Sequence, residues 1–315
     1  MPGLNLPYQP LRQKLYTRTD LFGTFRSGES ASWGETADFA IYQHFVMEGR
    51  STPSNAYMGM MQALHDNAIT QATYDLITDR RVAAIAGDHR MARDSKPYMQ
   101  LAILARRLTQ NCILVCTGGG PGAMEASHLG ASFAGATDAK LKKALARLKT
   151  QPEVPALGNI VNSKGLVDSA LVAQAHAWFK PAYEIAESIN SPGESLAVPT
   201  WHYGHEPTTP FATHIAKYFQ NSIREDGLLA LAKQGIVYAE GKAGTIQELF
   251  QDASQNYYKT FGCFSPMVLF GRRYWTKTYP VVGVLKKLFT TDFKKYVLVT
   301  DDIDDAAQFI EQFVP

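Results

Sequence analysis

From residue 81 onward, short apolar runs alternate with amphipathic helical stretches, and this alternation is the feature that most constrains the fold. The run at 82–86 ends at Gly87 and Asp88, an amphipathic stretch begins at Pro97, and a second run follows at 113–116. Strand, helix and strand at this spacing are typical of a parallel βαβ unit. Further apolar runs lie at 195–199, 235–239, 266–270 and 296–300. At least six strands that alternate with helices predict an α/β protein with a Rossmann-like, doubly wound parallel sheet.

The first 80 residues lack this alternation of apolar runs and helical stretches. Residues 1–35 are rich in Gly, Ser, Thr, Pro and Arg without a clear period, so we expect an irregular arm. Two stretches with apolar residues at helical spacing follow, at 35–47 and after Ser54, which is a good N-cap. We therefore expect an arm and helical extension over residues 1–80. Residues 81–315 are then expected to form one Rossmann-like domain, with an insertion at about 139–193.

Composition excludes several classes of protein. Hydrophobic residues make up 45% of the 315-residue chain, and 31 Lys and Arg nearly balance 29 Asp and Glu, which argues against a protein that coats nucleic acid. Three cysteines without a CxxC pair form neither a disulfide framework nor a four-cysteine zinc site. The N-terminus lacks the pattern of a secretory signal, and no apolar run reaches about 18 residues. We expect a cytoplasmic protein that neither spans a membrane nor needs a metal or cofactor.

The first of two glycine-rich loops lies at residues 117–125, Thr-Gly-Gly-Gly-Pro-Gly-Ala-Met-Glu, between a predicted strand and a predicted helix. Glycine lets the backbone turn sharply and approach a ligand, and the free N–H groups at the start of the helix attract an anion. The loop also fits the dinucleotide pattern G-x-G-x-x-A. A dinucleotide site requires an acidic residue at the end of the next strand, about 20 residues later. The candidate, Asp138, instead begins a basic helix. A tight turn without a ligand is a further alternative.

The second loop lies at residues 240–248, Glu-Gly-Lys-Ala-Gly-Thr-Ile-Gln-Glu, and also follows a predicted strand. Gly244 and Thr245 offer backbone N–H groups and a hydroxyl to a phosphate, and we expect Glu248 in the first helical turn nearby. The alternative is a capping box, with Thr245 as the N-cap and Glu248 as its partner. Because both loops follow strands of one parallel sheet, we expect them to converge on one cleft.

The two loops together resemble the motifs of the LONELY GUY family, whose members were long mislabelled lysine decarboxylases. The family's marks are a GGGxxGxM-type loop and a downstream PGGxGTxxE motif, and the version here looks most like the bacterial purine/pyrimidine nucleotide 5′-monophosphate nucleosidases. The similarity extends from about residue 82 to the C-terminus. It implies a Rossmann-like phosphoribohydrolase of nucleoside 5′-monophosphates that self-associates into a homo-oligomer. It also implies a substrate- and phosphate-binding set of Gly118, Gly119, Gly120, Gly122, Met124, Glu125, Gly241, Gly244 and Thr245.

This sequence departs from the family pattern in two places. Glu240-Gly241-Lys242 stands where the family has Pro-Gly-Gly. The family's catalytic arginine lies in an MxxRK stretch on the preceding helix. Here Arg224 is the nearest arginine, one residue out of register and without a following lysine. The anion-binding parts of the motif are therefore better preserved than the catalytic part.

Cleavage of an N-glycosidic bond builds positive charge on the ribose and negative charge on the departing base. A carboxylate near the sugar stabilises the first, by the logic of glycosidases. Glu248 is the first candidate for this role and Glu240 the second, while Arg224 is a candidate to hold the phosphate or assist the leaving base. A solvated position on a helix surface is the alternative for Arg224. The predicted reaction yields free base and ribose 5-phosphate. The rival prediction is a non-catalytic carrier or sensor of a phosphorylated ligand, such as a nucleotide or molybdenum cofactor.

Residues outside the loops complete the predicted site. The segment after the first strand, at 87–93, offers Asp88, Arg90 and Arg93 to the nucleotide, with a plain surface loop as the alternative. Tyr257, Tyr258, Tyr274 and Trp275 are candidates for stacking on the base, although core packing is the commoner role of such residues.

Two further patterns invite functional readings that we do not favour. The segment 201–206 holds two histidines and a glutamate, but it has no zinc-binding pattern and is expected to form a loop that lines the cleft. Cys112 and Cys116 are expected on one buried strand face, without a base partner that would make either a nucleophile.

Overall fold

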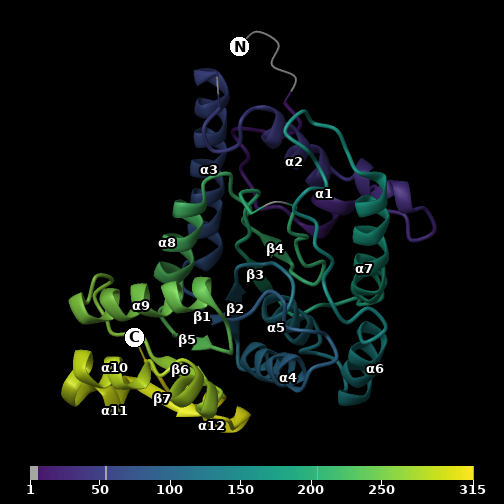
Figure 1. Ribbon diagram of the computed structural model, residues 1–315. Helices are drawn as coiled ribbons and strands as arrows, with labels where there is room; N and C mark the ends of the chain where they lie inside the picture. The colour runs from purple at the N-terminus through teal and green to yellow at the C-terminus, as the bar shows by residue number, and fades with distance from the viewer. Residues whose placement is uncertain (1–5, 54, 204, 315) are drawn as a thin grey trace.

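The computed structural model describes residues 6–53, 55–203 and 205–314, and its centre is a seven-stranded, all-parallel sheet (Figure 1). The strands occur in the spatial order β4-β3-β2-β1-β5-β6-β7. Their bounds are β1 Arg81–Ala86, β2 Ile113–Thr117, β3 Ser195–Ala197, β4 His214–Ile215, β5 Gly235–Tyr238, β6 Met267–Phe270 and β7 Val297–Thr300. The predicted α/β, Rossmann-like fold class is confirmed.

Helices fill the connections between the strands. The α-helices are α1 Arg18–Phe22, α2 Ala37–Met47, α3 Ala56–Ile77, α4 Lys96–Gln110, α5 Ala123–Ser132, α6 Asp138–Leu148, α7 Ser169–Glu187, α8 Asn221–Leu231, α9 Ala243–Tyr258, α10 Val282–Phe289, α11 Phe293–Tyr296 and α12 Ile303–Glu311. Shorter helical turns are η1 Ser30–Glu35, η2 Tyr274–Thr278 and η3 Thr290–Asp292. All six predicted strands are present. The sequence analysis missed β4, which has only two residues.

The order of the strands creates a switch point in the middle of the sheet. The chain runs outward from β1 through β2 and β3 to β4, and then returns to place β5 on the other side of β1. In open α/β sheets the connections leave in opposite directions at such a point, and a crevice opens beyond the carboxyl ends of the strands. The residues directly after β1, β2 and β5 therefore lie where a ligand site is expected.

Side chains alternate between the two faces of the sheet, and each face has its own hydrophobic cluster. On β1, Val82 and Ala84 belong to the first cluster, whereas Ala83 and Ile85 belong to the second. The first cluster contains residues of α2, α3, α8 and α9, and the second contains residues of α4, α5, α6 and α12. Helices on both faces are the arrangement that a buried parallel sheet requires.

The N-terminal segment contributes to the same core as the sheet. The predicted irregular arm contains α1 and η1, and Phe22 and Trp33 in it are fully buried. Trp33 packs against Phe179 of α7, with ring centroids 4.9 Å apart. The predicted helix over residues 35–47 is confirmed as α2. Helix α3 begins with Asn55 as its N-cap, and the predicted N-cap Ser54 lies outside the described residues.

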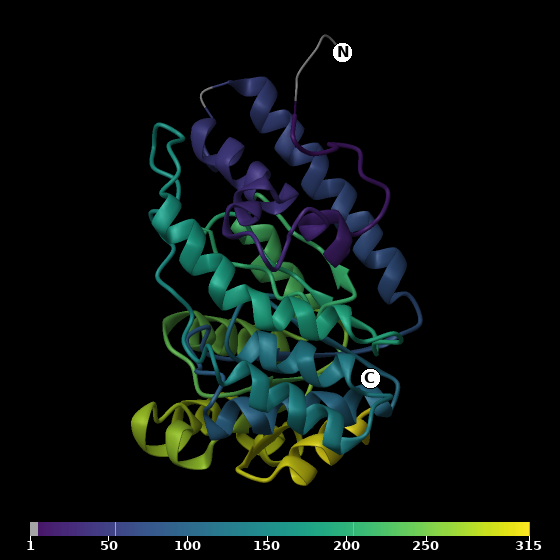
Figure 2. The same ribbon diagram turned by 90° about the vertical axis from the view of Figure 1, so that its right-hand side faces the viewer.

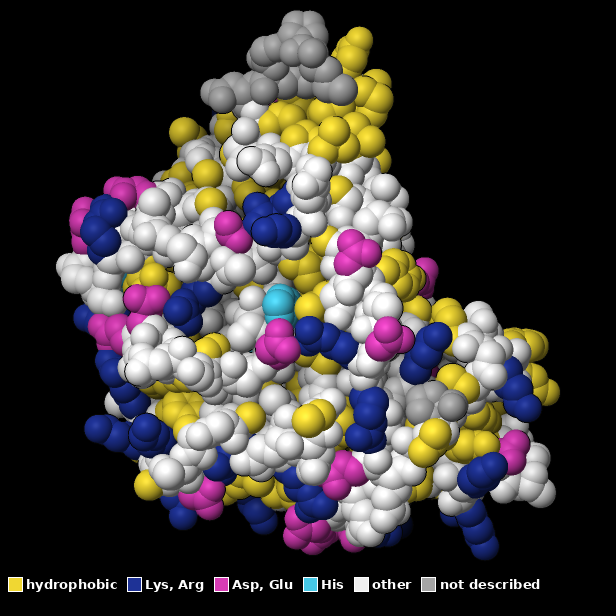
Figure 3. All heavy atoms as spheres, turned by 180° about the vertical axis from the view of Figure 1, so that it is seen from behind, with side chains coloured by type: hydrophobic (Ala, Val, Ile, Leu, Met, Phe, Trp, Pro, Cys, Tyr) yellow, Lys and Arg dark blue, Asp and Glu magenta, His cyan; other side chains and the backbone are white. Residues whose placement is uncertain are grey.

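The N-terminal segment and the last helices lie at opposite ends of the row of strands. In Figures 1 and 2 the N-terminal segment lies at the β4 end and α10, α11 and α12 lie at the β7 end. Seen from behind in Figure 3, hydrophobic side chains gather at the N-terminal end, and Lys and Arg are interspersed with Asp and Glu over the rest of that face. Among the described residues, no helix has both the length and the apolar character that a membrane crossing requires.

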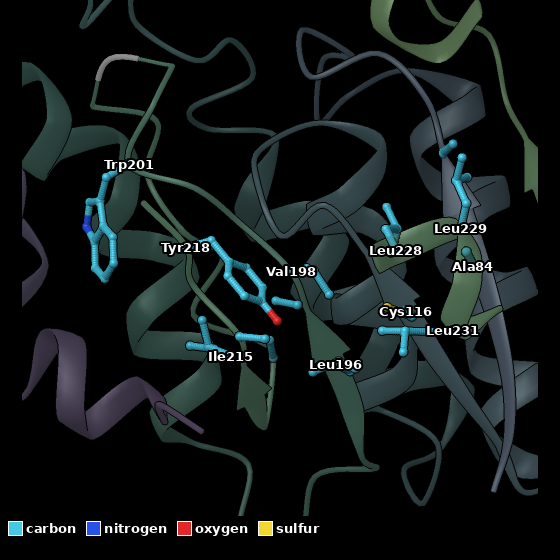
Figure 4. Packing of buried hydrophobic residues seen from close by; sticks show 14 of the residues in the cluster. Ala84, Cys116, Leu196, Val198, Trp201, Ile215, Tyr218, Leu228, Leu229 and Leu231 are labelled. Atoms are coloured by element: carbon cyan, nitrogen blue, oxygen red, sulfur yellow. The ribbon is translucent and has the colours of Figure 1, made fainter. Parts of the chain in front are cut away.

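Helix α8 carries Arg224 and packs its last turns against the sheet. Figure 4 shows Leu228, Leu229 and Leu231 of this helix close to Ala84 and Cys116 of the sheet, and all three leucines are buried. This contact fixes the last turns of α8 on the first face of the sheet.

Candidate functional site

A cavity of about 1270 Å³ opens at the carboxyl ends of the central strands. Its walls come from the segments after β1, β2 and β5, from α8, and from two further segments, 153–159 and residues 203 and 205–207. A second cavity, of about 160 Å³, is lined by residues such as Thr17, Ser132 and Phe211 and by none of the predicted site residues. The larger cavity is therefore the candidate site.

Asp88 connects the two glycine loops through its backbone. Its N–H donates to the carbonyl of Glu240 at 2.9 Å, and its own carbonyl accepts from the N–H of Ala123 at 3.1 Å. The end of β1 is thus bonded to the loop after β5 on one side and to the start of α5 on the other. Both loops face the cavity, so the predicted convergence is present in the structure.

The first glycine loop has a backbone shape that residues other than glycine rarely adopt. Gly119 and Gly122 have φ of +74° and +67°, values that favour glycine. The N–H of Gly119 donates to Thr117 Oγ1 at 2.9 Å, and this hydroxyl is hydrogen-bonded to the buried His128. A Cβ atom added at Gly122 would lie 2.3 Å from the carbonyl oxygen of Asp88. These glycines serve the packing of the loop, whereas Gly118 lines the cavity directly.

Arg224 and Glu248 meet inside the cavity, across the gap between α8 and α9. Arg224 Nη1 lies 3.6 Å from Glu248 Oε1, and the side chains are only 11% and 14% exposed. Arg224 Nε also donates to the carbonyl of Val198 at 3.1 Å, and a Cβ atom added at Gly118 would lie 2.1 Å from Arg224 Nη2. The guanidinium therefore lies on the glycine loop, and the alternative of a solvated helix residue is wrong.

The start of α9 forms another wall of the cavity. The helix begins at Ala243 with Lys242 as its N-cap, and no side chain caps it. Thr245 consequently lies inside the first turn and Glu248 in the second, so the capping box is wrong and Glu248 is one turn later than expected. Lys242, Gly244 and Thr245 line the cavity. The N–H groups of a first helical turn have no acceptor within the helix, so they remain available to an anion.

Two residues of the site were not assigned a role in the sequence analysis. Of the segment 201–206, which was expected to line the cleft, Tyr203, His205 and Glu206 line the cavity, whereas Trp201 is buried against Phe219. His205 is 2% exposed and stacks among rings of the N-terminal segment, including Trp33 and Tyr42. The sequence feature that could have identified His205 and Glu206 is their position after the strand at 195–199. The carboxyl end of this strand lies at the same edge of the sheet as the two glycine loops.

Burial shapes the ionisation of these groups. Burial raises the pKa of Glu248, while the nearby Arg224 opposes the rise. Burial likewise raises the pKa of Glu206, against the opposing effect of His89, Arg224 and Lys217. Burial lowers the pKa of His205 to about 4, so this histidine is neutral at pH 7.

Several predicted residues do not line the cavity. Arg93 and Glu125 form a buried two-pronged ion pair with each other, with both N···O distances 2.7 Å, and Tyr98 donates to Glu125 at 2.8 Å. Glu240 is exposed, on the side of the loop near Gly271. The members of the predicted set absent from the cavity lining are Gly119, Gly120, Gly122, Glu125, Gly241, Glu240 and Arg93, and those present are Gly118, Met124, Gly244, Thr245, Asp88, Arg224 and Glu248.

The aromatic candidates for base stacking also lie outside the cavity lining. Tyr274 donates to the carbonyl of Gly241, and Trp275 Nε1 donates to the carbonyl of Tyr238 at 3.0 Å, so both support the second loop from behind. Tyr257 and Tyr258 are exposed on α9. The aromatic side chain that does line the cavity is Tyr203.

The cysteine prediction is partly wrong. Cys116 is buried in β2, but Cys112 is exposed in the turn before the strand, with φ of +58°. Burial raises the pKa of the Cys116 thiol well above its ordinary value, so it is not a thiolate at pH 7. Among the described residues, no cluster of three His, Cys, Asp or Glu side chains has the geometry to hold a metal ion.

The fold and cavity together define a Rossmann-like α/β protein with a cleft at the switch point of its sheet. No protein-family model matches the chain, and no curated protein matches it. Among solved structures, the structural-genomics target TM1055 is similar at 17% identity, covering 74% of this chain and 99% of that one, with a TM-score of 0.44. The molybdenum cofactor carrier protein MCP from Chlamydomonas reinhardtii is similar at 14% identity, covering 74% and 97%, also with a TM-score of 0.44.

Similarity at this level has no bearing on ligand or activity. The resemblance of the two loops to the LONELY GUY family stays a prediction from the sequence motifs.

Proposed function

We propose that the protein hydrolyses the N-glycosidic bond of a nucleoside 5′-monophosphate, releasing the free base and ribose 5-phosphate. The observation that carries the proposal is the Arg224–Glu248 pair, which lies in the cavity beside the glycine loop and one turn into α9. A largely buried carboxylate is suited to stabilise positive charge on a ribose, and a fixed guanidinium is suited to a phosphate or a departing base.

The phosphate is assigned to the start of α9. The N–H groups of Ala243, Gly244 and Thr245, the Thr245 hydroxyl and the exposed Lys242 ammonium all belong to this short stretch of the cavity wall. Lys242 Nζ lies 3.8 Å from Asp88 Oδ2, a loose pair that a doubly charged phosphate would displace. Binding energy from the phosphate then positions the sugar at Glu248, one helical turn further on.

The base is assigned to the apolar part of the cavity. This wall is formed by the side chains of Pro121, Met124, Val154, Pro155, Leu157 and Leu171. The flat face of a base fits such a surface, and Tyr203 lies on the lining as a candidate for stacking.

Base release from a panel of nucleoside 5′-monophosphates tests the proposal directly. We expect wild-type protein to release free base from at least one of them, and Glu248→Gln to lower the rate by about 10²–10⁴-fold while nucleotide binding is retained, because the neutral amide cannot stabilise the cationic sugar. Glu187→Gln, at an exposed position on α7, is the matched control and is expected to keep full activity.

Two results would contradict this reading. Binding without release of base from any nucleotide would favour the carrier or sensor alternative, since the anion-binding elements would remain without the chemistry. Equal rates for wild type and Glu248→Gln would remove Glu248 from the reaction.

A further inference from the structure

The cavity contains a second carboxylate, Glu206, whose position is set by the first glycine loop. It belongs to the long connection between β3 and β4 and lines the cavity. A Cβ atom added at Gly120 would lie 3.0 Å from both Cδ and Oε1 of Glu206. The carboxyl group therefore lies directly on the loop, in the space that any side chain at position 120 would occupy.

Glu206 and Arg224 are neighbours along this loop. The Arg224 guanidinium lies on Gly118 and the Glu206 carboxyl lies on Gly120, two residues further on. The thioether of Met124 is close to both positions, 2.9 Å from a Cβ atom added at either glycine. The loop thus brings the Arg224 guanidinium and the Glu206 carboxyl to the part of the cavity where Glu248 also lies.

The two carboxylates have different surroundings. Glu248 is paired with Arg224 at 3.6 Å, which favours its ionised form. Among residues 6–53, 55–203 and 205–314, no hydrogen-bond donor or ion-pair partner reaches the Glu206 carboxyl. The charged or titratable groups that face it are His89 after β1, Arg224 on α8 and Lys217 after β4, and Lys217 is already bonded to Asp38 at 2.6 Å. Burial raises the pKa of Glu206, and its carboxyl has no ion-pair partner like the one that Arg224 provides for Glu248.

We propose that Glu206 is the proton donor to the departing base, while the ionised Glu248 faces the ribose; this inference rests on the function proposed above. As the bond from C1′ to the base nitrogen breaks, its electron pair stays with the base, and the base takes the proton of Glu206. Water adds to C1′ and gives its proton to Glu248. The two carboxyl groups then exchange protons with solvent, so that nucleotide and water yield base and ribose 5-phosphate. Pairs of carboxyl groups in unlike surroundings divide acid and base roles in this way.

The test compares leaving groups that need a proton with leaving groups that do not. The bases of nicotinamide mononucleotide and 7-methylguanosine 5′-monophosphate carry a positive charge and depart as neutral molecules. Glu206→Gln is expected to slow release from the best neutral-base nucleotide by about 10²–10⁴-fold, but release from these cationic substrates by no more than a few-fold. Glu248→Gln is expected to slow both classes. Nucleotide binding and melting temperature measure whether Glu206→Gln folds.

The pH profile of the wild-type protein gives a second measurement that needs no variant. With neutral-base nucleotides, kcat/KM is expected to fall as pH rises and Glu206 loses its proton, and this limb is expected to be missing with the cationic substrates. Equal slowing of both classes in Glu206→Gln, no slowing of either, or the same limb for both classes would overturn the role of Glu206 and leave the proposed hydrolysis intact. A wild-type protein that releases no base from any nucleotide would overturn both proposals.

Discussion

At Gly118 and Gly120, a single added carbon atom would collide with side chains of the site. Glycine in a loop after a strand is ordinarily explained by a sharp turn or by a ligand that approaches the backbone. Here the space beside these two glycines is occupied by the protein's own side chains, the Arg224 guanidinium and the Glu206 carboxyl. The sequence indicated that the loop needs glycine, but the partners that require it lie about a hundred residues away and cannot be identified from the motif.

Gly118→Ala is expected to abolish most base release with little loss of stability. The added Cβ atom would lie 2.1 Å from Arg224 Nη2, which is the far end of a flexible side chain and can move away. The guanidinium would then leave its position beside Glu248, and we expect at least a tenfold fall in kcat/KM with a melting temperature close to that of wild type.

Gly135→Ala is the control for this change, because nothing lies within 4 Å of a Cβ atom added there. Unchanged kinetics in Gly118→Ala would show that the position of Arg224 does not matter for the reaction.

At the scale of the secondary-structure elements, the start of α8 is held by a contact from α3. Asp66 of α3 is fully buried and accepts hydrogen bonds from the backbone N–H groups of Phe219 and Gln220, at 3.0 and 2.9 Å. Gln220 is the N-cap of α8, so Asp66 fixes the start of the helix that carries Arg224. On its other side, Asp66 is bonded to His65, and His65 to Tyr16.

Asp66→Asn is expected to destabilise the protein by about 1.5–3 kcal/mol, since a charged acceptor at a helix start is replaced by a neutral one. Urea unfolding measures the loss. Asp75→Asn, at an exposed position on the same helix, is the control and is expected to change stability by less than about 0.5 kcal/mol. If Asp66→Asn were as stable as the control, α8 would owe its position to the leucines on the sheet alone.

The strands and most helices were predictable because each has a continuous apolar or amphipathic pattern. Strand β4 was not, because two residues carry no pattern that distinguishes them from a loop. The start of α9 was misplaced for a related reason. Thr245 looks like an N-cap in sequence, but the helix begins two residues earlier, without a side-chain cap. The sequence places Arg224 on a helix. It does not show which way the Arg224 side chain points, because this direction depends on how α8 packs on the sheet.

On the scale of the whole molecule, the N-terminal segment is joined to the sheet region by a buried ion pair. Lys217, just after β4, donates to Asp38 of α2 at 2.6 Å and to Thr208 at 2.9 Å, and Trp201 Nε1 donates to the same Asp38 oxygen at 3.0 Å. Both charged side chains are nearly inaccessible to solvent. Such a link between residues 179 positions apart in the chain cannot be predicted from local pattern.

Lys217→Met is expected to cost about 3–5 kcal/mol, because it leaves the charge of Asp38 buried without a cationic partner. Combining it with Asp38→Asn removes both charges and is expected to recover much of that loss. Urea unfolding of the two variants measures the difference. A single variant as stable as wild type would mean that water reaches Asp38 and solvates it.

The two backbone hydrogen bonds of Asp88 restrict how a ligand can enter the cavity. The backbone N–H and carbonyl of Asp88 are hydrogen-bonded to both sides of the cavity. Outward movement of either glycine loop would therefore break a backbone hydrogen bond at the end of β1. Entry of a ligand past residues 153–159, or past residues 203 and 205–207, would leave both of these hydrogen bonds intact. Substitutions at Glu153 and Asn159, which line the cavity outside the wall assigned to the base, are then expected to change the rates of ligand binding and release more than the affinity.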